Sequence, residues 1–489
     1  MVASAVFATA ASVILATAAA GAPPANPPLA CHGPCMTRCA SAYDPPYMVG
    51  PPSPLAAVPR FYLHDEGGFN FSDVSAAVDR LLGGSPPDDV LPVDMAQHLF
   101  EYPLLRALRT HPQRTLSAGD AEVHVIGAMP FVSWALADLG ICLGDCSNGS
   151  LAEHQTRMHG VAEALRSNRY WNASRQQGTP FVLIVGHYSH YRHITESLTQ
   201  ELRRGNAMLA VSDPMHGKQM PAPKGSPLRG LVSHGITMPY WAHAHAAYVD
   251  GNRAERAGLM FHGGVGRHDY GTRDRLVRVM RLLQERGDPV DLRLAEFTRG
   301  GGADKETLHG ARRAAYQASG RAFLNASLCP SPAGDTTTSR RLFDAMSAAC
   351  VPILLRQPFF VKVQRATFYT GLPFPHSIDW RATTLRLLPS HDAKCAVGDV
   401  LWMSAWHGST SAVDEIRWRV LAAYRAHLDY SHNPRGVASA LLREVATRTR
   451  ARGAPTRLVG GAARLAEGGG DAAGRMNRGK VVVQVRGPR

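Results

Sequence analysis

Short apolar runs alternate with longer segments of helical periodicity along the first half of the chain. Strands are expected where the runs are apolar and bounded by turn residues, at residues 60–65, 121–131 and 181–185. Helices are expected where apolar side chains recur every three or four positions, at residues 94–110 and 151–168. This alternation predicts a parallel sheet covered by helices.

A second alternation of the same kind follows residues 236–243. Its expected strands are at residues 256–266, 290–297, 321–329 and 351–355, and its expected helices at 272–287, 305–319 and 339–350. A long helix at residues 414–430 is expected to close the ordered part. The chain therefore predicts two doubly wound α/β units in tandem, with a cleft between them.

The two ends of the chain differ from this body. Residues 1–22 carry no charge and end in small residues, which favours a cleaved signal peptide first and a signal anchor second. The missing basic start leaves an unstructured alanine-rich segment as the alternative. Residues 23–59 are rich in Pro, Ala and Gly and have three cysteines, as expected of a stem. The expected remaining divisions are domains at 60–245 and 246–395, a C-terminal helical segment at 396–450 and a disordered basic tail at 451–489.

Composition narrows the class of ligand. The 489 residues are 45% hydrophobic, enough for a large core, and carry a formal net charge of +14. Of this charge, +6 lies in residues 451–489. No segment interleaves Lys or Arg with aromatic residues, so nucleic acid is not an expected partner. A mildly basic body is compatible with an anionic small ligand or an acidic glycan.

Cysteines and glycosylation sequons agree with a secretory route. Three cysteines have C-x3-C-x3-C spacing and two more form a later pair: Cys31, Cys35, Cys39, Cys142 and Cys146. In a secreted chain they would be bridged, with a connectivity that spacing does not give. This spacing is not a strong zinc motif. N-x-S/T sequons occur at Asn70, Asn148, Asn172 and Asn325.

The segment GDTTTSRRLFDAM, residues 334–346, has the composition of an anion site. A helix that begins here would present unpaired backbone N–H groups and the positive end of its dipole to a ligand. Arg340 and Arg341 would add planar donors for a diphosphate, and Asp344 could accept hydrogen bonds from a ribose. Ser339 or Thr338 would cap the helix. The alternative is a solvated pair of arginines, one of which pairs with Asp344.

The strand expected within residues 256–266 runs into a glycine-rich turn, HGGVG, at residues 262–266. It lacks the full dinucleotide-binding pattern G-x-G-x-x-G. From its residues alone, the segment is compatible with a tight turn whose arginine, Arg267, faces solvent.

The C-terminal half resembles the exostosin family of glycosyltransferases. The similarity is strongest over residues 329–355 and in LPFPHSIDW, residues 372–380. Upstream segments such as FEYPLL and HGITMPYWAH are similar to successive blocks of that family, in the same order. The resemblance covers about residues 61–389. It implies a GT-B architecture, with two Rossmann-like domains, and inverting transfer from a nucleotide sugar without a required divalent metal.

The resemblance also assigns site residues. Arg341 aligns with the family's arginine near the donor diphosphate and Asp344 with its acidic residue at the ribose. The same loop is lined by Gly334, Asp335, Ser339 and Arg340. The resemblance also implies that the HGGVG turn opens the second domain beside the donor, with Gly263 next to it and Arg267 able to contact its diphosphate. The His-Asp pair that often follows the first domain's last strand is His187-Tyr188 here, and the usual glycine-cysteine is Ala349-Cys350.

His187 is the candidate catalytic base, and a packed, hydrogen-bonded histidine is the alternative. Further histidines follow at positions 190, 193, 243 and 245, but no carboxylate or cysteine completes a zinc site with them. No metal site is therefore expected.

The expected function is an inverting transferase that moves a sugar from a UDP-sugar to a glycan in the Golgi or another secretory lumen, with a possible N-terminal membrane anchor. A homo- or hetero-oligomer is compatible with this function. The competing hypothesis is a catalytically inactive exostosin-like subunit that binds glycan or a partner. An NAD-linked oxidoreductase would explain the alternating elements but not the segment at 334–346.

Overall fold

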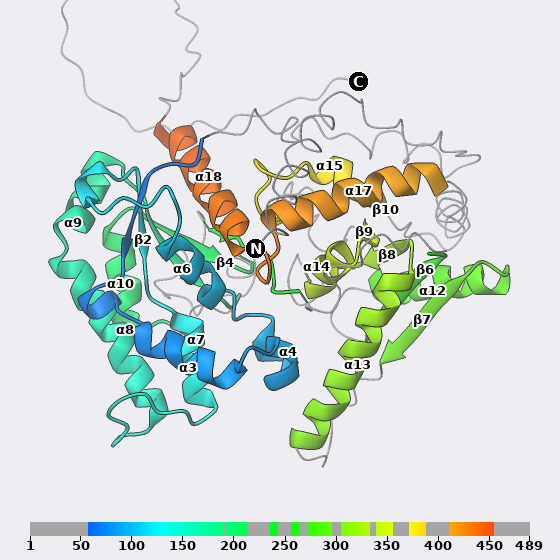
Figure 1. Cartoon of the computed structure of the whole chain (residues 1–489), viewed down its shortest axis with the longest axis horizontal. Coiled ribbons are helices and arrows are strands. Elements are labelled where there is room, and N and C mark those ends of the chain that lie inside the picture. Colours follow the sequence, from blue (N-terminus) through cyan, green and yellow to red (C-terminus); the bar gives the residue numbers. More distant parts are fainter. Residues whose placement is uncertain are drawn as a thin grey trace, which may run out of the picture.

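The computed structural model describes residues 57–188, 192–213, 235–242, 256–264, 272–295, 305–332, 339–355, 371–387 and 410–453. Two α/β domains lie side by side, each built on a five-stranded parallel sheet (Figure 1). This two-domain, GT-B-like arrangement of parallel sheets agrees with the sequence prediction, except that the strands of the first sheet lie in chain order and that sheet is not doubly wound.

The strands of the first sheet follow one another in chain order. They are β1 (Phe61–His64), β2 (Val123–Ile126), β3 (Phe181–Val185), β4 (Ala207–Val211) and β5 (Ile236–Thr237). Their residues are almost all buried, because helices cover a parallel sheet on its faces.

The strands of the second sheet do not follow one another in chain order. Its order is β10-β9-β8-β6-β7, so β7 lies on one side of β6 and the later strands lie on the other. The strands are β6 (Leu259–Gly264), β7 (Val290–Ala295), β8 (Leu328–Ser331), β9 (Val351–Leu355) and β10 (Leu385–Leu387). The doubly wound order thus belongs to this sheet, and ligands of such sheets bind where the order reverses, beyond the carboxyl ends of the strands.

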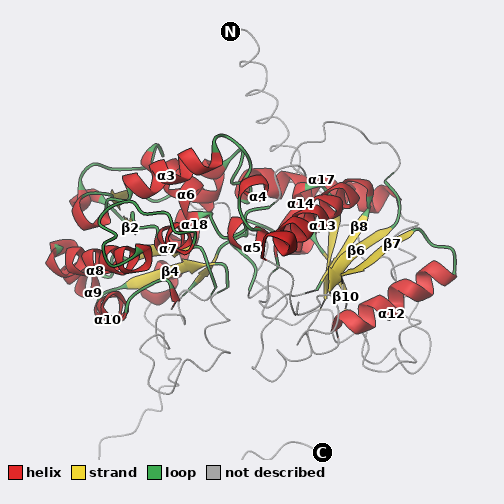
Figure 2. Ribbon diagram, turned by 90° about the horizontal axis from the view of Figure 1, so that it is seen from below, coloured by secondary structure: helices red, strands yellow, loops and turns green. Residues whose placement is uncertain are grey.

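Helices surround both sheets. In the first domain these are η1 (Gly67–Phe69), α3 (Ser72–Leu82), α4 (Pro87–Val90), α5 (Val93–Ala96), α6 (Glu101–Arg109), η2 (Ala118–Asp120), α7 (Pro130–Asp138), α8 (Ser150–Ser167), α9 (Arg169–Gln177) and α10 (Glu196–Arg204). In the second they are α12 (Thr272–Glu285), α13 (Lys305–Asn325), α14 (Arg340–Ser347), α15 (Trp380–Thr383) and α17 (Thr410–His427). Helix α12 lies on one face of the second sheet, and α13, α14 and α17 lie on the other (Figure 2).

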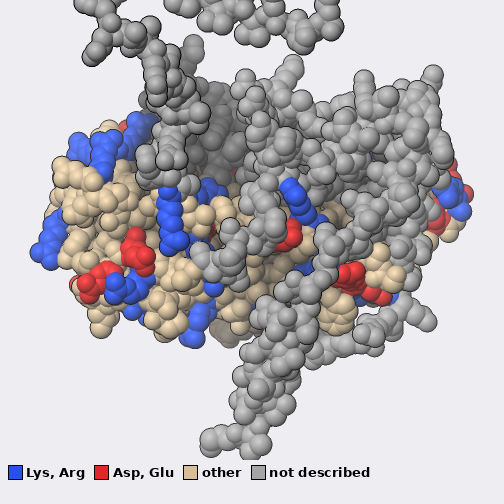
Figure 3. Space-filling view, turned by 90° about the horizontal axis from the view of Figure 1, so that it is seen from above, with Lys and Arg blue, Asp and Glu red and all other residues tan. Residues whose placement is uncertain are grey.

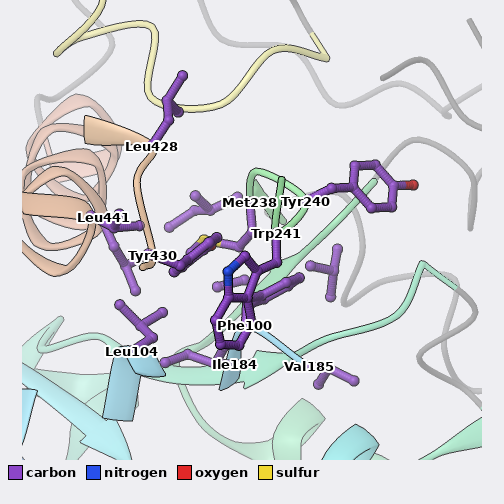
Figure 4. Packing of buried hydrophobic residues seen from close by; sticks show 14 of the residues in the cluster. Phe100, Leu104, Ile184, Val185, Met238, Tyr240, Trp241, Leu428, Tyr430 and Leu441 are labelled. Atoms are coloured by element: carbon purple, nitrogen blue, oxygen red, sulfur yellow. The ribbon is translucent and has the colours of Figure 1, made fainter. Parts of the chain in front are cut away.

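The last described helix, α18 (Pro434–Gly453), returns to the first domain. It packs on α6 and against β2 and β5, whereas α17 packs on α14 and β9 of the second domain. The link between them is fixed by Tyr430, whose ring stacks on Phe100 and whose hydroxyl donates to the carbonyl of Pro239 at 3.2 Å (Figure 4). The indole N–H of Trp241 donates to the hydroxyl of Ser431 at 3.0 Å. The two domains therefore share one buried apolar cluster.

Three expectations about local structure are wrong. The helix expected at 94–110 is divided into α5 and α6, because Pro103 is accommodated only in the first turn of a new helix. The strand expected at 321–329 is helical up to Asn325 and becomes β8 only at Leu328. Helix α18 continues to Gly453, into the range expected to be disordered.

Two disulfides lie in the described residues. One joins Cys142 to Cys146, the pair noted in the sequence, and the other joins Cys329 at β8 to Cys350 before β9. On one face, Lys and Arg side chains occur at several separate places with Asp and Glu among them (Figure 3). None of the helices within the described ranges is both long and apolar enough to span a bilayer. The expected signal segment and stem, at residues 1–22 and in most of 23–59, lie outside those ranges, as do Cys31, Cys35 and Cys39.

Candidate functional site

The reversal of strand order in the second sheet lies between β6 and β8. Strand β6 ends at Gly264 and β8 ends at Ser331, so both carboxyl ends meet at this point. Helix α14, which begins at Arg340 shortly after β8, packs on β8 and β9. The helix expected from residues 334–346 is therefore formed, and it begins beside the position where ligands of doubly wound sheets bind.

Arg341 and Gly263 are brought together at this edge. The guanidinium of Arg341 donates from Nε and Nη2 to the carbonyl oxygen of His262, at 3.2 and 2.8 Å, and lies 4.8 Å from the ring centroid of Phe261. A Cβ atom on Gly263 would lie 2.6 Å from Nη2 of Arg341. A side chain at this position would therefore require the guanidinium of Arg341 to shift.

A second arginine, which the sequence interpretation missed, lies near the first. Arg273 is in the first turn of α12 and is buried. Burial and the positive charge of Arg273 lower the pKa of Arg341 to about 10. Two cations held close together in a partly buried place favour an anion, which would relieve their repulsion. No local signal marked Arg273, because Asp274 follows it in the same first turn of α12.

Arg340 has carboxylate partners inside the protein. It forms two hydrogen bonds with Asp88 of α4, one of them from Nη1 at 2.7 Å, and its Nε lies 3.5 Å from Oδ1 of Asp344. Burial alone would lower its pKa, but the carboxylates of Asp88 and Asp344 outweigh burial and raise it. The i,i+4 pairing with Asp344 is the alternative considered from sequence. That Arg340 and Asp344 contact a bound nucleotide sugar stays a prediction.

Ser339 occupies the N-cap position of α14 but does not cap the helix with its side chain. Its hydroxyl instead donates to the carbonyl of Pro332 at 3.4 Å. The first turn of α14 therefore keeps backbone N–H groups that no side chain of the N-cap satisfies. Gly334, Asp335 and Arg267, also expected at the donor, lie outside the described residues.

His187 lies at a sharp corner after β3 in the first domain. Its ring centroid lies 4.3 Å from that of His98, 5.6 Å from that of Phe131 and 4.1 Å from that of Tyr188. Because β4 and β5 follow in the same sheet, β3 is the middle strand and not the domain's last strand as the sequence comparison implied. These contacts are compatible with both interpretations of His187, as a packed histidine and as a catalytic base.

Three buried side chains hold Gly186, the residue before His187. The carboxylate of Glu101 accepts from the Gly186 N–H at 2.6 Å, while His98 Nδ1 and the Ser212 hydroxyl lie 2.9 and 2.6 Å from the Gly186 carbonyl oxygen. A Cβ atom on Gly186 would lie 2.1 Å from the carbonyl oxygen of His98. These contacts therefore fix the backbone at Gly186, and with it the position of the adjacent residue, His187.

Glu101 also binds the start of α7. Its Oε1 and Oε2 accept from the N–H groups of Phe131 and Val132, both at 3.0 Å. Burial raises the pKa of Glu101 to about 8, although the three N–H donors oppose that shift. The sequence interpretation missed Glu101; a lone carboxylate inside the apolar segment FEYPLL was the available signal.

Tyr240 connects this corner to the second domain. Its ring lies 5.1 Å from that of His98 and 6.0 Å from that of Phe343 on α14. Arg340 also lies close enough to contribute to lowering the pKa of buried His98, after burial and His187. The His187 corner and the start of α14 are thus neighbours across the two domains.

One group of possible metal ligands occurs among the described residues. Ligand atoms of Cys142, Cys146 and Glu153 lie within 4.8 Å of one another. The two cysteines are joined in a disulfide and offer no thiolate to a metal.

Comparison with known proteins identifies the family. Residues 145–394 match the family described as the Exostosin GT47 domain, and this range is 250 of the 489 residues. The chain belongs to the exostosin family of glycosyltransferases. The matched range contains the His187 corner, Arg273 and all of α14, so this exostosin chain has its candidate site within the family domain.

No curated protein matches this exostosin chain in sequence. Among solved structures it is similar to one described as "Crystal structure of GtfA/B complex", with 12% identity, a TM-score of 0.29, and coverage of 60% of this chain and 61% of the other. It is also similar to the pneumococcal O-GlcNAc transferase GtfA in complex with UDP and GlcNAc, with 11% identity, a TM-score of 0.24, and coverage of 61% and 58%. The chain thus spans less than two thirds of these structures. TM-scores this low carry no information about the candidate functional site.

Proposed function

We propose that the protein is an inverting glycosyltransferase that moves a sugar from a UDP-sugar to a glycan acceptor. The observation that carries this proposal is the pair of arginines, Arg273 and Arg341, beside the reversal of strand order and the start of α14. In an enzyme of this type the acceptor hydroxyl attacks the anomeric carbon, the bond from that carbon to the diphosphate breaks, and UDP leaves with the bonding electrons.

The diphosphate gains negative charge as it leaves. Arg341, Arg273 and the backbone N–H groups of the first turn of α14 would stabilise that charge. Because cationic side chains supply this stabilisation, we propose that no divalent metal is required. Turnover that persists in excess EDTA supports this part of the proposal, and turnover that EDTA abolishes and Mg²⁺ or Mn²⁺ restores refutes it.

The acceptor hydroxyl must also lose a proton. His187 is the proposed base, because the fixed Gly186 corner holds it next to α14 through His98, Tyr240 and Phe343. On this proposal the proton moves from the acceptor oxygen to the imidazole of His187 as the new glycosidic bond forms.

The experiment is a UDP-release assay with a panel of UDP-sugars and oligosaccharide acceptors. We expect turnover of at least one UDP-sugar, loss of turnover in His187→Gln with UDP affinity retained, and loss of UDP affinity in Arg341→Ala. The packing of His187 between aromatic rings favours one alternative, an inactive subunit that binds a glycan or a partner. Binding of UDP without turnover of any UDP-sugar would support that alternative.

We propose the secretory lumen as the site of action, with an N-terminal anchor as one route to it. Two disulfides in the described residues and the exposure of all four sequon asparagines support this location. The lumen of the Golgi is the compartment expected for glycan synthesis by such an enzyme.

A further inference from the structure

A buried ion pair joins the two domains next to the proposed donor site. Arg340, the first residue of α14, binds Asp88 of α4 in the first domain, with Nη1 to Oδ1 at 2.7 Å and Nη2 to Oδ2 as a second contact. Each residue is only 5% exposed. The two residues are 252 positions apart, so the pair forms only when the domains are docked.

Neighbouring groups hold the guanidinium of Arg340 in place. It lies 5.4 Å from the ring centroid of Tyr316 on α13, and its Nε lies 3.5 Å from Asp344. Helix α5 contacts α13, and both α4 and α5 lie near α13 and α14 in the view of Figure 2. A bidentate contact between a buried guanidinium and a buried carboxylate fixes both the distance between these planar groups and their relative orientation.

Arg340 and Arg341 are adjacent in the first turn of α14. A contact that holds Arg340 in place also fixes the rotation of α14 about its axis. It thereby fixes the direction in which the Arg341 side chain leaves the helix. Arg341 in turn reaches the carbonyl of His262 at the end of β6. Asp88 therefore acts on the anion site through Arg340, without belonging to the domain that carries the site.

We propose that Asp88 is a positioning residue, which couples docking of the first domain to the orientation of Arg341 toward the donor diphosphate. The inference rests on the proposed function, because the ligand is the diphosphate of the donor. It adds that donor affinity depends on a carboxylate of the opposite domain.

The test is calorimetry of UDP binding to the full chain, with thermal unfolding measured in parallel. The variants are Asp88→Asn and, as a matched control, Asp94→Asn. Asp94 also crosses the interface, pairing with Arg312 at 2.8 Å, but its side chain is 66% exposed. We expect UDP affinity to fall at least about tenfold in Asp88→Asn, because a small misplacement of a binding group has effects of that order. The control should remain within about threefold of the wild type, as for other exposed pairs.

A second variant keeps the test decisive if Asp88→Asn does not fold. Asp88→Glu keeps a negative charge beside Arg340 but moves the carboxylate by one methylene group, so the bidentate geometry changes while no buried charge loses its partner. We expect Asp88→Glu to be more stable than Asp88→Asn and still to bind UDP at least about threefold more weakly than the wild type.

Two results separate the inference from the proposed function. If the wild type binds UDP and the folded variants at Asp88 bind it equally well, the pair is only structural and the inference is overturned. If the wild type itself binds no UDP, the proposed donor is wrong, and the inference falls with it.

Discussion

The carboxylate of Glu101 accepts a hydrogen bond from the backbone N–H of Gly186 at 2.6 Å, 85 positions along the chain. The same carboxylate satisfies two N–H groups at the start of α7. A single buried side chain thus joins α6, α7 and the corner after β3. The corner that carries His187 is consequently a rigid part of the core, although its residues follow the strand as a loop.

Glu101→Ala should destabilise the protein by about 3 kcal/mol or more, because it leaves three buried N–H groups without an acceptor. Glu101→Gln should cost only about 1 kcal/mol, since an amide oxygen still accepts from part of this set. Urea denaturation measures both values. The control is Glu163→Ala on the surface of α8, whose side chain is 68% exposed and whose loss should change stability by less than about 0.5 kcal/mol. Equal effects of the two alanine variants would show that Glu101 does not organise the corner.

Arg341→Ala should weaken UDP binding by about 1.5 to 3 kcal/mol, the range for hydrogen bonds to a charged group. Arg273→Ala should weaken UDP binding as well, because Arg273 lies close enough to Arg341 to lower its pKa, and a second positive charge at that distance attracts the same anion. Arg278→Ala, on the exposed side of α12, is the matched control and should bind UDP like the wild type. Calorimetry at low and high salt measures all three. An unchanged affinity in folded Arg341→Ala would remove this residue from the donor site.

The protein should lose stability in mild acid because of buried histidines. His64 and His124 share a hydrogen bond of 3.0 Å between ring nitrogens. Burial lowers the pKa of His64 to about 3, with a contribution from His124, and burial lowers the pKa of His124 to about 4. Both bind protons more weakly when folded, so their stabilisation is present above the ordinary histidine pKa and is lost as the pH falls toward the folded values.

Between pH 6.5 and 5 the loss should be about 2 kcal/mol for each of these histidines. Denaturation at a series of pH values measures it. His124→Gln removes one of the two titrations and should reduce the loss by about 2 kcal/mol. His159→Gln, at an exposed position on α8, should leave the pH profile unchanged. A wild-type stability that is flat from pH 7 to pH 5 would contradict the prediction.

Local patterns were sufficient for much of the second domain, although not for residues 321–329. The apolar run of β9 and the start of α14 were each predicted from a few consecutive residues, and Gly263 and Arg341 do meet. Gly263 and Gly264, which were expected in a turn, belong to strand β6. Strand β4, AMLAV, had the same signal as β3 and was overlooked.

The remaining features depend on contacts between distant residues. Asp88 is one of two consecutive acidic residues that follow two prolines, and nothing nearby in the sequence indicates its partner; only docking of the domains shows that it pairs with Arg340. Likewise, Glu101 stands in an apolar helix without any partner nearby in sequence, because its three donors come from α7 and Gly186. Such pairs follow from the fold, which short motifs do not encode.

Ala349→Gly should stabilise the donor helix and the protein. Helix α14 ends in a Schellman motif, in which the N–H of Cys350 donates to Ala345 and the N–H of Ala349 to Met346, at 2.9 and 3.1 Å. Ala349 has φ of 56°, a left-handed conformation that favours glycine, the residue the family resemblance implies at this position.

Relief of this strain should exceed the entropy that glycine loses on folding, for a net gain of about 1 kcal/mol. The control lies in the same motif: Ala348 has φ of −85°, so Ala348→Gly relieves nothing and should destabilise by about 0.5 to 1 kcal/mol. Urea denaturation of the two variants, both with the Cys329–Cys350 disulfide intact, gives opposite signs if the left-handed backbone at Ala349 is the cause. A loss of stability in both would mean that the methyl group of Ala349 contributes more by packing than its conformation costs.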